Sequence, residues 1–102
     1  MNLRPPKNST SLALYLLLNA GMKGYTSYDA VVSDRFFKFS TRISDLVRKH
    51  NLKVHKKLEP GNNRFGHPYL STRYTLYLSD IFENIVLYNE INKEIKEKVV
   101  TE

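Results

Sequence analysis

The chain has no cysteine among its 102 residues, and this absence excludes two kinds of stabilised small domain. Without cysteine there is neither a disulfide framework nor a thiolate zinc site, and a reducing cytoplasm is the compartment that we expect. The three histidines lack the spacing of metal ligands. The sequence therefore predicts no metal and no cofactor. It also has no internal repeat and no low-complexity tract.

Long apolar runs are missing too. The run at residues 12–18 is far too short to cross a bilayer, so we predict no membrane contact. This run follows Arg4 and Lys7 as in a signal peptide, but residues 19–23 are typical of a helix end and not of a cleavage site. We expect a soluble, unprocessed protein.

Motifs for catalysis are absent as well. No pair of carboxylates is spaced for acid–base work, and there is no Gly-x-Ser-x-Gly motif and no phosphate-binding loop. Residues 61–63 (Gly-Asn-Asn) are interpreted as a turn. We therefore do not expect an enzyme.

What the chain does have is an uneven charge. Residues 1–78 hold 13 Lys and Arg against four Asp and Glu, a net charge of +9, whereas residues 79–102 hold three Lys against six acids, a net charge of −3. The hydrophobic share of 41% and the aromatic share of 12% suffice for one folded domain with a modest core. The charge pattern predicts a basic part that meets a polyanion and an acidic part that meets protein.

The first half of the chain is expected to be helical. Pro5 and Pro6 predict a flexible N-terminal arm over residues 1–8. Asn8, Ser9 or Thr10 can cap a first helix that runs through residues 11–18 and is apolar almost all round, as a buried central helix is. Gly21 and Gly24 end this helix and make the turn.

Two further helices are predicted after that turn. The first is short, at residues 28–33, with Thr26 or Ser27 as its N-cap. The other covers residues 37–50, and Asn51 can adopt a left-handed C-cap. At a period of 3.6 this helix has an apolar face and a polar face. The apolar face contains Phe39, Ile43, Leu46 and Val47, and the polar face contains Lys38, Thr41, Arg42, Asp45, Arg48 and Lys49.

Strand patterns follow. Residues 52–58 begin as an alternating strand, and residues 71–78 alternate strongly, with Tyr74, Leu76 and Leu78 on one face. Dense turn chemistry between them predicts a long basic loop, a wing at residues 59–70. The alternation explains Tyr74 as a core residue, with Tyr69 and Tyr77 covering the sheet, and it is preferred to a role for these rings in stacking single-stranded bases.

A last helix is predicted from Ile81 to about Lys98, within a C-terminal segment 79–102. Its apolar residues follow the 4-3-4-3 spacing of an a/d seam, which predicts an oligomerisation element in a homodimer or higher homo-oligomer. The seam contains Ile81, Ile85, Tyr88, Asn92 and Ile95. The alternative is a helix packed on its own domain, with Asn92 exposed.

The cations carry the functional hypothesis. The side chains on one face of the predicted helix 37–50, and those of nearby residues, can neutralise the phosphates of a nucleic acid. The predicted DNA-binding residues are Lys38, Thr41, Arg42, Arg48, Lys49, Lys56, Lys57, Arg64 and Arg73. Arg42 is the best candidate for a bidentate contact with guanine, and Asp45 is expected to orient Arg42, Arg48 or Lys49 through a local ion pair. The arm is a weaker candidate for minor-groove contact.

The order of motifs resembles the small winged helix-turn-helix proteins of bacteriophages and prophages. The matching pieces are residues 24–30 (Gly-Tyr-Thr-Ser-Tyr-Asp-Ala), 42–49 (Arg-Ile-Ser-Asp-Leu-Val-Arg-Lys), 63–66 (Asn-Arg-Phe-Gly) and 73–76 (Arg-Tyr-Thr-Leu). The resemblance implies a DNA-binding domain at residues 9–78. In it, Lys38, Thr41 and Arg42 approach bases or phosphates while Arg64 approaches the flanking backbone.

The expected fold class is therefore α+β, mainly α with a small β-hairpin: three helices, a two-stranded wing and a C-terminal helix. The chain departs from the family where Phe36 and Phe37 occupy the helix–helix turn, and the helix after residue 78 is an addition.

Three functions fit this expectation. The leading one is a phage or mobile-element transcriptional regulator that binds double-stranded DNA in the host cytoplasm, with helix 37–50 in the major groove and the wing on the backbone. The second is DNA packaging in the manner of a small terminase subunit, or an architectural role on DNA. The third is a winged-helix protein-interaction module, such as an inhibitor of a host protein, whose contact lies on the acidic last helix.

Overall fold

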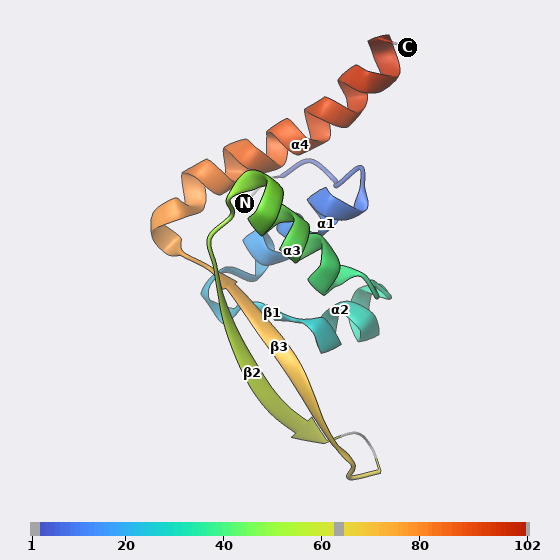
Figure 1. Ribbon diagram of the computed structural model, residues 1–102, viewed down its shortest axis with the longest axis vertical. Coiled ribbons are helices and arrows are strands. Elements are labelled where there is room, and N and C mark those ends of the chain that lie inside the picture. The colour runs from blue at the N-terminus through green and yellow to red at the C-terminus, as the bar shows by residue number, and fades with distance from the viewer. Residues whose placement is uncertain (1–2, 63–64, 102) are drawn as a thin grey trace.

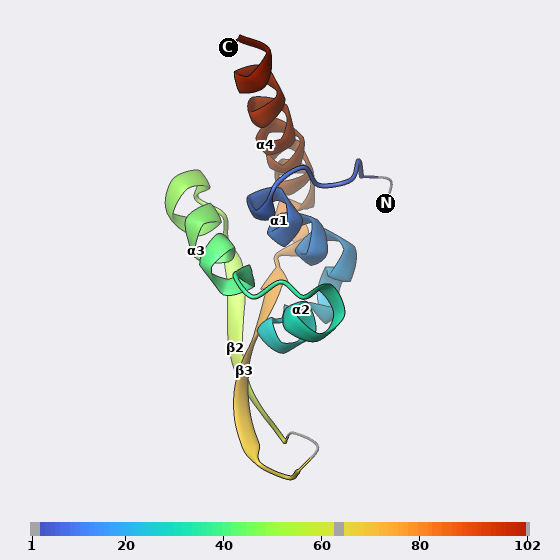
Figure 2. The same cartoon turned by 90° about the vertical axis from the view of Figure 1, so that its right-hand side faces the viewer.

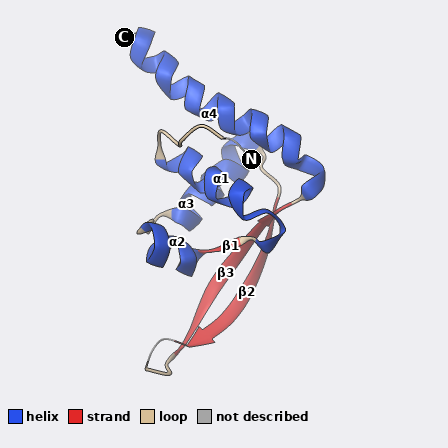
Figure 3. Cartoon of the chain, turned by 180° about the vertical axis from the view of Figure 1, so that it is seen from behind, coloured by secondary structure: helices blue, strands red, loops and turns tan. Residues whose placement is uncertain are grey.

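The computed structural model describes residues 3–62 and 65–101, with the backbone alone described at residues 62 and 93–101. The chain belongs to the α+β class, as predicted (Figures 1 and 3). The elements follow in the order α1 (Ser9–Ala20), η1 (Gly21–Lys23), β1 (Tyr25–Thr26), α2 (Ser27–Asp34), α3 (Phe39–His50), β2 (Val54–Asn62), β3 (Pro68–Leu76), η2 (Leu78–Asp80) and α4 (Ile81–Thr101).

Helix α1 is the centre of the helical body, as its apolar sequence predicts. Asn8 caps it: the Asn8 side-chain oxygen accepts from the Ser11 backbone N–H at 2.8 Å, and the Ser11 hydroxyl accepts from the Asn8 N–H at 3.2 Å. This reciprocal cap satisfies two N–H groups at the helix start. The buried face of α1 consists of Ser11, Ala13, Leu14, Leu17 and Leu18.

Helices α2 and α3 have the expected caps but not all of the expected bounds. Thr26 caps α2 by accepting from the Asp29 N–H at 2.9 Å, and Asn51 ends α3 at a φ of 57°. Helix α3 begins at Phe39, two residues later than predicted. Phe36, which precedes α3, is buried in the core. The residues just before Phe39 form the turn that brings the Phe36 ring inward, so the helix begins after them.

The sheet has three antiparallel strands, one more than the two that the sequence predicted. The strand order is β1-β3-β2, and Tyr25 of β1 is opposite Tyr74 of β3. Strands β2 and β3 pair as far as Asn62 opposite Pro68, so most of the predicted 59–70 loop is ladder. Pro60 is compatible with β2 because β2 is an edge strand, in which every second N–H points away from the ladder.

Two predicted core positions are exposed. Tyr74 and Leu76 are buried as expected, but Leu78 is 68% exposed because β3 ends at Leu76 and the strand alternation ends with it. Val47 is 36% exposed at the edge of the apolar face of α3, whereas Phe39, Ile43 and Leu46 are fully buried.

Helix α4 packs on α1 and on the N-terminal arm (Figures 1 and 2). The Tyr88 hydroxyl donates to the Arg4 carbonyl, and the Lys7 N–H donates to the Asn92 side-chain oxygen at 3.3 Å. Residues 3–8 thus lie against α4, whereas the sequence predicted a free arm.

The residues of the predicted α4 seam mostly contact other parts of the same chain. Tyr88 and Asn92 are buried, and Ile81 and Ile85 are partly buried against the core. This corresponds to the packing of α4 on its own domain, except that Asn92 is buried and not exposed. The Ile95 side chain lies outside the described residues.

The hairpin of β2 and β3 and the C-terminal part of α4 extend from opposite ends of the body (Figure 1), and the molecule is 52 Å long. Among the helices of the described ranges, none is both long and apolar enough to cross a membrane.

Candidate nucleic-acid interface

The polar face of α3 points away from the body. Phe39, Ile43 and Leu46 bury the opposite face, so the side chains between them are directed outward. The exposed residues of this face are Lys38, Thr41, Ser44, Arg48 and Lys49, while Arg42 and Asp45 are half-buried. The helical period alone predicted this orientation for all of these residues except Ser44.

Asp45 lies between two arginines of the same face. Its carboxylate is 2.8 Å from Arg42 Nη1 and 2.7 Å from Arg48 Nη2, and both pairs are three residues apart. The Arg48 side chain is 69% exposed, so its ion pair stabilises the fold by less than about 1 kcal/mol. Asp45 therefore orients Arg42 and Arg48, the role that the sequence predicted, while its charge opposes the approach of phosphate.

The Arg42 guanidinium is less available than its sequence position predicts. Asp45 engages Nη1, and Nε is buried and has no hydrogen-bond partner among the described residues. Arg48, which is more exposed, has more of its guanidinium open to a ligand. Of the two arginines, Arg48 is thus the better placed for a new bidentate contact.

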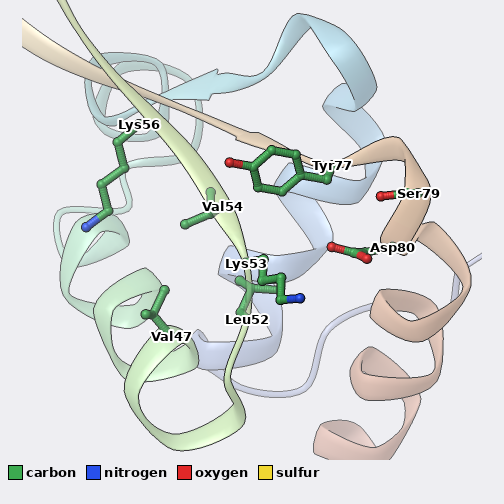
Figure 4. A pocket seen from close by; sticks show the side chains of 8 residues that line it. All are labelled: Val47, Leu52, Lys53, Val54, Lys56, Tyr77, Ser79 and Asp80. Carbon is green, nitrogen blue, oxygen red and sulfur yellow. The ribbon is translucent and has the colours of Figure 1, made fainter.

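Strand β2 continues the basic surface. Lys53, Lys56 and Lys57 are exposed. Lys53 and Lys56 border a shallow groove of about 530 Å³ between the end of α3 and the base of the hairpin (Figure 4). The groove also contains Val47, Leu52, Val54, Tyr77, Ser79 and Asp80. The lining thus combines apolar side chains with two lysines and one carboxylate.

Arg73 does not belong to this exposed surface, although it was predicted to bind DNA. Its Nε donates to the Glu59 carboxylate at 2.8 Å and its Nη1 donates to the Lys23 carbonyl at 2.9 Å. The hydrogen bond from Arg73 lowers the pKa of Glu59 and raises the pKa of Arg73. Arg73 therefore joins β2, β3 and the η1 turn. Arg64 lies outside the described residues.

The hairpin is fixed to α2 by contacts that the sequence analysis missed. The Tyr28 N–H donates to the Ser71 hydroxyl at 3.2 Å, and the Ser27 hydroxyl lies 3.2 Å from that same oxygen. The Tyr28 and Tyr69 rings are stacked with centroids 5.0 Å apart. These contacts set the direction of the hairpin relative to the helices.

Gly61 belongs to the same arrangement. It is opposite Tyr69, and a Cβ on Gly61 would lie 2.6 Å from the Tyr69 ring. The ring therefore occupies the space that a side chain at position 61 would need. A glycine paired with an aromatic residue across two strands would have predicted this contact, but the pairing can be recognised only when the strand register is known.

Exposed cations are concentrated in residues 38–57, named here the basic surface. Residues 38–57 hold seven Lys and Arg and a single acid, Asp45, and six of the seven cations are exposed. Helix α3 leads through a short link into β2 (Figure 2), so these cations lie on consecutive elements of the chain.

Comparison of the chain with protein-family models, with curated proteins and with solved structures found no match.

Proposed function

We propose that this chain is a winged helix-turn-helix protein that binds double-stranded DNA, with α3 in the major groove and the β2–β3 hairpin as the wing. The succession of α1, β1, α2, α3, β2 and β3 supports this fold, because it places a helix pair directly before a projecting hairpin. The sheet order β1-β3-β2 supports it as well, because it anchors the hairpin to the helices through β1.

The observation that carries the proposal is the basic surface of residues 38–57. A surface with seven cations and one acid attracts a polyanion and releases its counterions on binding. The acid is itself engaged by Arg42 and Arg48. Arg48, Lys49, Lys38 and Thr41 are the proposed contacts of α3, and Lys56 and Lys57 those of the wing.

The test is a salt titration of binding to random duplex DNA, followed by selection from a randomised duplex pool at the salt concentration where random binding fades. An enriched motif supports a sequence-reading regulator, and its half-site spacing reports the arrangement of two copies. Binding without an enriched motif favours packaging or architectural use. No binding at low salt overturns the proposal.

Two substitutions separate base reading from phosphate contact. Arg48→Ala is expected to reduce the discrimination between selected and random duplex, whereas Lys57→Ala weakens both alike. The control is Lys23→Ala, which removes an exposed cation outside residues 38–57. If both variants bind like the parent, this surface is not the interface.

A second candidate function, contact with another copy of the chain, is favoured by the outer face of α4. Phe82 and Val86 are exposed there four residues apart, and Phe82 is 79% exposed. Leu78 of η2, four residues before Phe82, is exposed as well. Deleting the helix would also remove Tyr88 from the core. A test that leaves the core intact compares the sedimentation of the parent with that of the Phe82→Ser/Val86→Ser variant, which is expected to lose self-association. A parent that sediments as a monomer counts against this role.

A further inference from the structure

We propose that the distal half of the hairpin is an apolar wedge, which enters the minor groove beside the α3 site and bends the duplex at a deformable base step. The wedge consists of Leu58, Pro60, Pro68 and Leu70, named here the distal patch. The inference rests on the proposed DNA binding and adds the kind of duplex that the protein selects.

The strand register places the distal patch on one face. Pro60 is opposite Leu70, Leu58 is opposite Thr72, and Pro68 is opposite Asn62. Opposed residues in an antiparallel ladder share a face, and so do alternate residues along each strand. The same face continues inward to Tyr74 and Leu76, which are buried in the core. The distal patch is therefore on the side of the sheet that carries α3.

The apolar side chains of the distal patch have no core to enter. Leu58 is 65% exposed and Leu70 is 70% exposed, and both prolines are exposed. The hairpin extends beyond the helices at this point (Figure 1). Exposed leucines on one face of an edge hairpin are an aggregation hazard, so a contact that uses them explains their presence.

The surrounding charge specifies the partner. Lys56 is the next residue inward on the same face and is exposed, whereas Lys57, one residue along, is on the opposite face. Exposed apolar side chains next to an exposed cation fit a ligand whose rim carries negative charges and whose interior is apolar. The minor groove of duplex DNA combines phosphate rims with sugar and base-step surfaces, and inserted Leu and Pro side chains unstack such steps in other proteins.

The dimensions agree with a second groove on the same duplex. Val54 borders the groove beside α3, and Pro60 is six residues farther along β2. Six residues of strand span about 20 Å. Half a helical turn of DNA, which separates a major groove from the next minor groove on one side of the duplex, is about 17 Å. With α3 in the major groove, the distal patch reaches the adjacent minor groove.

The width of the hairpin leads to bending. Two strands are about 4.8 Å apart before side chains are counted, whereas the minor groove is about 6 Å wide. The hairpin thus fits only where the groove opens. Opening is easiest at flexible pyrimidine–purine steps such as TA. The substrate class is therefore duplex DNA with such a step about half a turn from the α3 site.

The experiment measures the bend directly. Two 30-base-pair duplexes carry a donor and an acceptor dye at their ends; one contains central TA steps and the other an A-tract. At low salt, saturating parent protein is expected to raise energy transfer on the TA duplex and to bind it several-fold more tightly than the A-tract duplex. Leu58→Ala/Leu70→Ala keeps the lysines, so we expect binding within about threefold of the parent but little change in energy transfer.

The matched control is Met22→Ala/Val32→Ala, which removes two exposed apolar side chains elsewhere and is expected to bend DNA like the parent. Equal melting temperatures establish that all variants fold. Binding without bending by the parent, or bending by the Leu58→Ala/Leu70→Ala variant, overturns the wedge but leaves the proposed DNA binding intact. No duplex binding at low salt overturns both. Patch-dependent binding to vesicles of phosphatidylserine and phosphatidylcholine, with no bending of DNA, also overturns the wedge and identifies an anionic lipid surface instead.

Discussion

Gly24 lies directly against Tyr74 of β3: a Cβ on Gly24 would be 2.8 Å from the Tyr74 carbonyl oxygen and 2.5 Å from Thr75 Oγ1. Gly24 also has a φ of 76°, a conformation that other residues rarely adopt. The approach brings the chain into β1 beside β3, so the position of the hairpin on the helices depends on the absence of a side chain at this point.

Gly24→Ala is expected to destabilise the fold by roughly 3 kcal/mol, because strain at a positive φ adds to a clash with backbone that cannot rotate away. Gly21→Ala is the matched control: Gly21 also has a positive φ of 61°, but no described atom lies within 4 Å of its Cβ position. Its backbone strain is comparable, so Gly21→Ala should be less destabilising than Gly24→Ala by the contribution of the clash. Urea unfolding measures both, and equal losses would contradict the role of the close approach.

Asp45→Asn is expected to tighten binding to random duplex several-fold at 0.1 M salt. The substitution removes the one acid of the basic surface and frees Arg48 for phosphate, which steepens the dependence of log affinity on log salt by about one unit. Glu83→Gln on α4 removes the same charge outside the surface and serves as the control. Weaker binding by a folded Asp45→Asn protein would mean that orientation of the arginines outweighs repulsion.

Tyr88→Phe is expected to release the N-terminal arm. The variant lacks the hydroxyl that donates to the Arg4 carbonyl, a loss of about 1 kcal/mol. The bond after Lys7 then becomes a faster trypsin site, which mass spectrometry follows over time. Tyr77→Phe, which removes an exposed hydroxyl, should be cleaved there at the parental rate. Unchanged cleavage in Tyr88→Phe would show that Asn92 and Leu3 suffice to hold the arm.

The pH dependence of stability should carry a contribution from Tyr25. Burial, and then the hydrogen bond to the Asp34 carboxylate, raises the pKa of Tyr25 from 10.0 to about 12. Between these values the folded chain keeps a proton that the unfolded chain has lost. The contribution of Tyr25 is therefore complete below pH 10 and declines as the pH rises toward 12. Urea unfolding at pH 9, 10 and 11 should show a shallower decline for Tyr25→Phe than for Tyr77→Phe and the parent.

Local chemistry explains which parts of the fold were predictable. Asn8, Thr26 and Asn51 act as caps because each satisfies or ends a helix through neighbours within a few residues. The outward cations of α3 follow from the helical period in the same way. Strand β1 was not predictable on these terms, because its partner Tyr74 is far along the chain and two residues carry no periodicity.

The same reason explains which contacts of the candidate-site residues the sequence could not indicate. From the sequence alone Arg73 has no recognisable partner. Only the folded structure brings the Glu59 carboxylate and the Lys23 carbonyl within hydrogen-bond distance of it. The spacing of apolar residues in α4 indicated a seam but could not indicate which partner covers it. Tyr88 and Asn92 contact the arm, while Phe82, outside the predicted seam, is exposed.

The arm on α4 also has a consequence for the order of folding. Helices α1, α2 and α3 depend on near neighbours, but the bonds from Tyr88 to Arg4 and from Lys7 to Asn92 each join residues about 85 positions apart. During synthesis the arm leaves the ribosome more than 80 residues before its partners on α4. The arm therefore lacks these partners until α4 has been made, and the contacts between them close a loop whose entropy cost exceeds that of the local contacts in α1, α2 and α3.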